Sequence, residues 1–201
     1  MTAKLLHMIG LRPNTGDCLV KFIVGFVLGL VAVPLGLYWY FANGNAPVAT
    51  AAAPMPFEKM LARKAQHAVI EREMPRNVPI QGDEANFTAG AQVYRDNCAV
   101  CHGLPSQPRT AAAIGMFPVP PALLEGKGVT DDPAGETYWK VANGIRLTGM
   151  PGFKQSLSDT QMWQVSVLLA QADKLPASVK QSLAAPLAPA VSPAGGDPAK
   201  P

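Results

Sequence analysis

The hydrophobic positions of the chain divide it into segments of different character. Residues 22–41 form a run of 20 positions without a charged side chain, about the length that an α-helix needs to cross the roughly 30 Å of a bilayer core. The following stretch, 42–56, is uncharged and rich in alanine and proline, which is typical of a semi-rigid linker. The pattern therefore predicts one transmembrane anchor joined to the rest of the chain by a spacer.

A helix over 57–74 is predicted directly after the linker, and Pro75 closes it. Its apolar positions recur near helical spacing at Phe57, Met60, Leu61, Ala65, Ala68 and Val69. Its charged side chains nearly balance, so a partner subunit and anionic lipid both stay open as contacts. We expect a solvated connector, a helix and a loop over 57–81.

Three further helices are predicted within 82–176, over 86–97, 136–143 and 158–174. Gly90 in the first of them leaves room for another helix to approach closely. Gly144 lies at the position where a glycine commonly ends a helix, directly after the second helix. Ser158 and Gln161 have the form of a capping box at the start of the third helix. This segment is therefore expected to be an all-α domain.

The last residues, 177–201, are again rich in alanine and proline and hold few large apolar side chains. Such a composition cannot bury a core, so we expect a disordered tail. A short helix over 178–184 is an alternative for its first part.

Charge restricts the possible partners. The chain of 201 residues has a net charge of +3, yet residues 85–175 carry seven basic and seven acidic side chains. A balanced domain predicts neither nucleic-acid binding nor strong electrostatic steering toward an acidic partner. Docking of a partner protein would then rely on apolar surface.

The motif Cys98-Ala99-Val100-Cys101-His102 carries the chemistry of the chain. Two thiols and an imidazole at this spacing are what covalent attachment of a c-type haem requires. Each sulfur adds to one vinyl group of the porphyrin, and the histidine becomes the proximal ligand of the iron. The motif occurs once, so one haem c per chain is predicted.

Two other uses of a Cys-x-x-Cys motif lack their partner residues. A zinc site needs further ligands at matching spacing, and the remaining candidates, Cys18, His7 and His67, all lie far upstream. A thioredoxin-like motif follows a strand, whereas the residues before Cys98 are predicted to be helical.

The sixth ligand of the iron decides between gas or substrate binding and electron transfer. We expect Met150, which lies in a glycine- and proline-flanked loop, Asn143 to Phe153. A thioether sulfur is a suitable ligand for haem iron. Met116 and Met162 are the alternatives, although Met162 falls on the apolar face of the last predicted helix.

The flanks of the apolar run predict its orientation. Lys4, Arg12 and Lys21 precede it and an aromatic belt, 38–41, ends it, so the positive-inside rule places residues 1–21 in the cytoplasm. The haem domain would then face the periplasm from the bacterial inner membrane. A cleaved signal peptide is disfavoured because its apolar region would be shorter.

Gly25 and Gly29 form a GxxxG pair within the apolar run, which allows close packing with another helix. Cys18 precedes the run and has no evident role.

These residues resemble the class I c-type cytochromes, and specifically the membrane-anchored monohaem members found in bacteria. The resemblance rests on Cys98 to His102, Gly90, Tyr94 and Trp163, and on Gly149-Met150-Pro151. It implies a fold of a few helices and long loops around one haem. The first and last helices would cross through Gly90, Tyr94 and Trp163.

The same resemblance implies that His102 donates a hydrogen bond to a proline carbonyl, for which Pro118, Pro120 and Pro121 are candidates. The loop from Gly103 to Gly135 would cover one edge of the haem. Arg146 and Thr148 each have two possible roles, either beside a haem propionate or in shaping the loop and facing solvent.

The sequence thus predicts a membrane-tethered electron-transfer protein, not an enzyme, in which His102 and Met150 ligate the haem iron. Redox partner proteins or subunits of a respiratory complex would exchange electrons with it. One alternative is a fixed subunit of a respiratory oxidoreductase. Another is a gas sensor or peroxidase-type enzyme, for which the sequence offers no distal histidine and arginine constellation.

Overall fold

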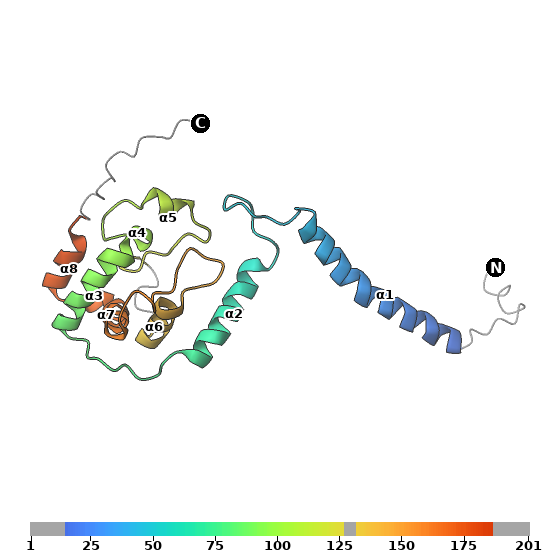
Figure 1. Ribbon diagram of the computed structural model, residues 1–201, viewed down its shortest axis with the longest axis horizontal. Coiled ribbons are helices and arrows are strands. Elements are labelled where there is room, and N and C mark those ends of the chain that lie inside the picture. The colour runs from blue at the N-terminus through green and yellow to red at the C-terminus, as the bar shows by residue number, and fades with distance from the viewer. Residues whose placement is uncertain (1–14, 127–131, 187–201) are drawn as a thin grey trace, which may run out of the picture. The chain divides into compact units, whose positions relative to one another are not determined.

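The computed structural model describes residues 15–126 and 132–186, and every regular element in these ranges is helical (Figure 1). The all-α prediction is therefore confirmed. The chain divides into two compact units, residues 1–48 with 52–55, and residues 49–51 with 56–201. Each unit is described by itself below.

The first unit contains one long helix, α1 (Thr15–Ala42). By length and composition its segment Cys18–Ala42 could cross a membrane, and the predicted run 22–41 lies inside that segment. A Cβ atom built on Gly25 or Gly29 would meet no other atom within 4 Å, so this surface of the helix is smooth. The predictions for residues 1–14 lie outside the described residues.

The second unit contains the three helices predicted within 82–176, and each begins or ends at a residue that explains its boundary. In α3 (Glu84–Asn97), the carboxylate of Asp83 accepts a hydrogen bond from the Asn86 amide over 2.9 Å. Both halves of the predicted capping box at Ser158 are present at the start of α7 (Asp159–Ala170). The third, α6 (Ala134–Asn143), ends at Gly144, whose φ of 69° favours glycine.

Helices α3 and α7 cross at Gly90, as predicted. A Cβ atom built on Gly90 would lie 2.3 Å from the carbonyl oxygen of Gln164, so the two backbones meet where a side chain is absent. Tyr94 of α3 and Leu168 of α7 are fully buried beside this crossing. The ring of Trp163 stacks on the ring of Tyr138 in α6, with 4.2 Å between the two centroids.

The domain extends beyond the boundary predicted at residue 176. Residues 177–184 form α8 (Ala177–Ala184), which packs against α3. Val179 and Leu183 are 1% and 2% exposed and belong to the same core as Phe87 and Tyr94. The prediction of a disordered tail is therefore wrong for 177–184, and the alternative of a short helix over 178–184 is confirmed. Two large apolar side chains four positions apart are enough to dock this helix. Residues 187–201 lie outside the described part.

Helix α2 (Glu58–Glu73) forms over the predicted connector, but it is not simply solvated. It packs against α6 (Figure 1), and Ile70 is 2% exposed. The apolar stripe identified in the sequence faces outward instead, since Met60 and Leu61 remain 46% and 59% exposed. The prediction of a solvated connector is therefore wrong for the face around Ile70, whereas the apolar stripe is solvated.

Candidate functional site

The cysteine and histidine motif lies at the end of α3, where a second short helix, α4 (Ala99–His102), continues the chain. Cys98 is at once the C-cap of α3 and the N-cap of α4. The turn brings Cys98, Cys101 and His102 to one wall of a cavity of about 330 Å³. Two thiols and an imidazole thus share one lining, as the motif requires.

One proline carbonyl holds the imidazole of His102. Its Nδ1 lies 2.8 Å from the carbonyl oxygen of Pro121, so Pro121 is the partner among the three prolines that the sequence left open. Burial lowers the pKa of His102, and the Pro121 contact opposes this shift. A neutral ring whose Nδ1 donates to a carbonyl keeps Nε2 available as a metal ligand.

Met150 lines the same cavity from the loop that follows α6. Hydrogen bonds fix that loop, because the Met150 amide donates to Thr148 Oγ1 over 3.1 Å and the Thr148 hydroxyl donates to the Ile145 carbonyl over 2.7 Å. Thr148 therefore shapes the loop, and it also lines the cavity. Arg146, next to Ile145, is exposed.

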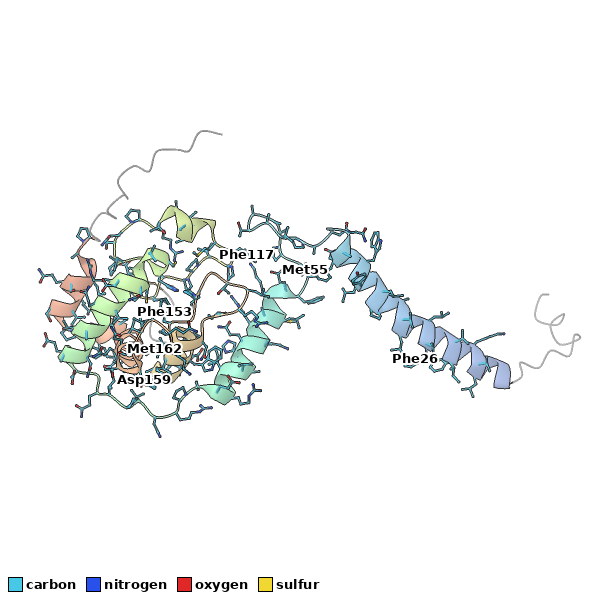
Figure 2. All side chains as sticks on the ribbon, viewed as in Figure 1. Phe26, Met55, Phe117, Phe153, Asp159 and Met162 are labelled. Atoms are coloured by element: carbon cyan, nitrogen blue, oxygen red, sulfur yellow. The ribbon has the colours of Figure 1, made fainter. Side chains whose placement is uncertain are left out.

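The two alternative methionines lie in different surroundings. Met162 is 3% exposed and belongs to the core on α7 (Figure 2), so it is not on the cavity wall. Met116 does line the cavity, and its sulfur would lie 2.9 Å from a Cβ atom built on Gly149. The structure thus brings Met150 and Met116 to the site and separates Met162 from it.

Most of the cavity wall is apolar and comes from four segments of the chain. The proline-rich loop and the residues just after it contribute Pro118, Val119, Pro120 and Leu123. Helix α6 and the loop that follows it contribute Val141, Ile145 and Phe153, and α7 contributes Leu169. An apolar lining excludes water from whatever the cavity holds. The loop predicted to cover one edge of a haem is part of this wall over residues 116–123.

Sequence reasoning missed four polar residues of the cavity lining, Gln66 of α2 with Asp132, Thr137 and Lys140. The Lys140 ammonium forms ion pairs with Asp132 and with Glu136, the latter over 2.9 Å. Burial alone would lower the pKa of Lys140, but these two carboxylates outweigh burial and raise it. The spacing of Glu136 and Lys140 on one helix is the signal in the sequence that could have indicated this pair.

The two other uses of the motif find no support in this geometry. Burial raises the pKa of the Cys98 thiol to about 12, and the nearby Cys101 contributes to this shift in second place. A redox-active thiol needs a lowered pKa instead. Within the described residues, no group of three or more His, Cys, Asp or Glu side chains is placed to hold a metal ion. A zinc site would need such a group.

The donor set fits a haem. Two thiols and a backbone-oriented imidazole lie on the wall of an apolar cavity that a thioether also lines, and these are the groups that attach a c-type haem and ligate its iron. Residues 85–169 match the family model of cytochrome c oxidase, cbb3-type, subunit III. The chain contains a c-type cytochrome domain.

No curated protein matches the chain. The cytochrome domain begins one residue into α3 and ends within α7, so it includes the motif, the proline-rich loop and the Met150 loop. A domain of this family implies haem c and electron transfer through it. Helices α2 and α8 lie outside the matched residues although both pack on the domain.

Proposed function

We propose that this chain is a membrane-tethered carrier of single electrons, in which one haem is bound covalently through Cys98 and Cys101. His102 and Met150 would be the axial ligands of its iron, and the chain itself would not be an enzyme. The observation that carries the proposal is that all four side chains line one cavity while Pro121 orients the imidazole.

A bound haem supplies an iron that alternates between the ferrous and ferric states. The protein contributes the surroundings of that iron. The Pro121 carbonyl accepts the Nδ1 proton of His102, so Nε2 would be available to the iron as a neutral ligand. The hydrogen-bonded loop around Thr148 holds Met150 in place without regular secondary structure. Little rearrangement of the ligands is then needed when the iron changes its charge.

The apolar helix before the domain supports tethering. Cys18–Ala42 is long and apolar enough to cross a membrane, and we propose that it holds the haem domain on the periplasmic side of the bacterial inner membrane through the linker 42–56. A tether raises the effective concentration of a carrier near membrane-bound donors and acceptors.

A second candidate is a fixed subunit of a respiratory oxidoreductase, which the family match favours because the matched family is an oxidase subunit. The smooth surface at Gly25 and Gly29 would suit packing of α1 against a helix of another subunit. The two candidates differ in one observable. After mild detergent extraction from the host membrane, a carrier migrates alone, whereas a subunit migrates with a stable complex.

Covalent attachment is tested by the intact mass of the full chain, expressed in a bacterium that matures c-type cytochromes. Wild type and Cys18→Ser are expected to carry the added mass of one haem and to be reduced reversibly. The double variant Cys98→Ser with Cys101→Ser is expected to carry none. A wild type without covalent haem, or a double variant that retains it, would overturn the proposal.

A further inference from the structure

Helix α2 presents one face to the cytochrome domain along its whole length. Lys59, Gln66, Ile70 and Glu73 are separated by seven, four and three positions, so at about 100° per residue they fall within one narrow stripe. Each of the four contacts the domain or lines its cavity. Ala68 lies on the opposite face and is exposed.

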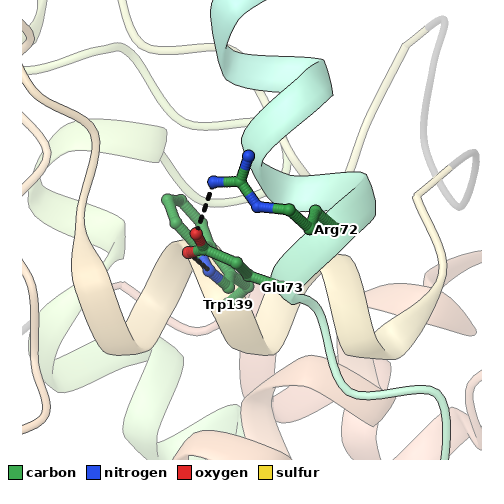
Figure 3. A network of polar contacts seen from close by, with 3 residues as sticks. All are labelled: Arg72, Glu73 and Trp139. Carbon is green, nitrogen blue, oxygen red and sulfur yellow. Dashed lines mark hydrogen bonds and ion pairs between the residues drawn. The ribbon is translucent and has the colours of Figure 1, made fainter.

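The helix is attached at both of its ends. Near its start, the Lys59 ammonium lies 5.7 Å from the centre of the Phe117 ring, in the loop that also carries the proline-rich wall (Figure 2). Near its end, the Trp139 indole donates a hydrogen bond to the Glu73 carboxylate over 3.2 Å, and Arg72 pairs with the same carboxylate (Figure 3). Ile70 is buried just before this second attachment.

The backbone just after α2 approaches the backbone of α6 as closely as the backbones of α3 and α7 approach each other where they cross. A Cβ atom built on Gly135, in the first turn of α6, would lie 2.0 Å from the Pro75 carbonyl oxygen. The chain can pass here because Gly135 has no side chain. The position of α2 on the domain is therefore set by backbone contact as well as by side chains.

Gln66 lies between the two attachments, and its side chain is part of the cavity wall together with the haem-binding motif and Met150. The family match begins at residue 85, so this part of the wall is an addition to the matched domain. Lys140 and Asp132 line the same cavity, and Lys140 also pairs with Glu136.

We infer that α2 closes one edge of the cofactor site and that Gln66 is the side chain with which it faces the haem. The inference rests on the proposed function, since it takes the cavity to be the haem site. An uncharged amide on a closing helix covers that edge of the haem without adding a charge of its own.

A charge placed at position 66 would therefore act on the iron from the cavity wall, where solvent screens it less than on the outer face of the helix. The ferric state carries one more positive charge than the ferrous state. A carboxylate beside the haem stabilises the ferric state and lowers the reduction potential, and an ammonium raises it. The same charge on the outer face of α2 is separated from the haem by the helix and is screened by solvent.

The test is a redox titration at pH 7.5 of the full chain in detergent, in wild type and four variants. Gln66→Glu and Gln66→Lys place opposite charges on the inner face, and Ala68→Glu and Ala68→Lys place the same charges on the outer face. We expect the midpoint potential to fall in Gln66→Glu and to rise in Gln66→Lys. Both Ala68 variants should retain the wild-type value.

Equal potentials in all five proteins, or shifts of the same size at positions 66 and 68, would overturn the inference and leave the proposed function standing. A wild type that lacks covalent haem would overturn both. Gln66 is only half-buried, so a charged side chain can be accommodated there. The two substitutions predict shifts of the midpoint potential with opposite signs, and either variant alone decides the question if the other fails to fold.

Discussion

The imidazole Nδ1 of His102 lies 2.8 Å from the carbonyl oxygen of Pro121, which is 19 positions later in the chain. This contact joins the attachment motif to the proline-rich loop, which also lines the cavity. Because a carbonyl oxygen only accepts, the contact requires the proton on Nδ1 and leaves the Nε2 lone pair free for the iron.

The crossing of α3 and α7 predicts a large penalty for a single added methyl group. Gly90→Ala would place a Cβ atom 2.3 Å from the backbone oxygen of Gln164, and neither helix backbone can yield cheaply. We expect a loss of about 1–3 kcal/mol in the free energy of unfolding. Guanidinium titration followed at the Soret band measures it on the full chain.

Gly115→Ala is the matched control, because a Cβ atom built there meets nothing within 4 Å. Its unfolding free energy should stay within about 0.5 kcal/mol of wild type. Equal stabilities of the two variants would mean that the helices do not cross at Gly90.

The docking of α8 makes a second prediction. Leu183→Ala removes a side chain that is 2% exposed in the shared core, and the expected cost is about 2–5 kcal/mol. Gln181→Ala, on an exposed position of the same helix, should be close to neutral. The same guanidinium titration compares them, and a neutral Leu183→Ala would restore the domain boundary at residue 176.

Tyr138 predicts how stability changes at alkaline pH. Its hydroxyl donates a hydrogen bond to the Asp159 carboxylate. This bond, and to a smaller extent burial, raises the pKa of Tyr138 to about 12. The unfolded value is about 10. The folded state therefore holds the phenolic proton more tightly, and the resulting stabilisation is complete below about pH 10 and is lost toward pH 12.

Tyr138→Phe lacks this proton, so the stability of the variant should fall less steeply than that of wild type between about pH 10 and 12. Thermal denaturation midpoints across this range measure the difference. Parallel curves for the two proteins would show that the bond to Asp159 does not perturb the titration.

Local signals predicted the helices well because the groups that determine them are neighbours in the sequence. The capping box at Ser158 and the glycine at position 144 act over three or four residues, and the motif at Cys98 needs no distant partner to be recognised. Gly90 could be assigned to a close contact because it lacks a side chain within a predicted helix, although its partner, Gln164, is distant in the sequence.

Other features depend on distant contacts and could not be obtained from the pattern alone. The outward apolar stripe of α2 is as periodic as a buried one, and the inner face is defined by contacts with Phe117 and Trp139, far along the chain. The choice of Pro121 over its neighbours depends on which carbonyl the fold turns toward the imidazole. The docking of α8 depends on a complementary surface on α3.

Axial ligation by Met150 is the central claim, and the spectrum of the reduced protein with and without carbon monoxide tests it most directly. Wild type and Met116→Ala should be unchanged by the gas, because under this proposal Met150 would occupy the sixth position in both. Met150→Ala should show a shifted Soret band. Ready binding of carbon monoxide by wild type, or a shift in Met116→Ala but not in Met150→Ala, would contradict the account.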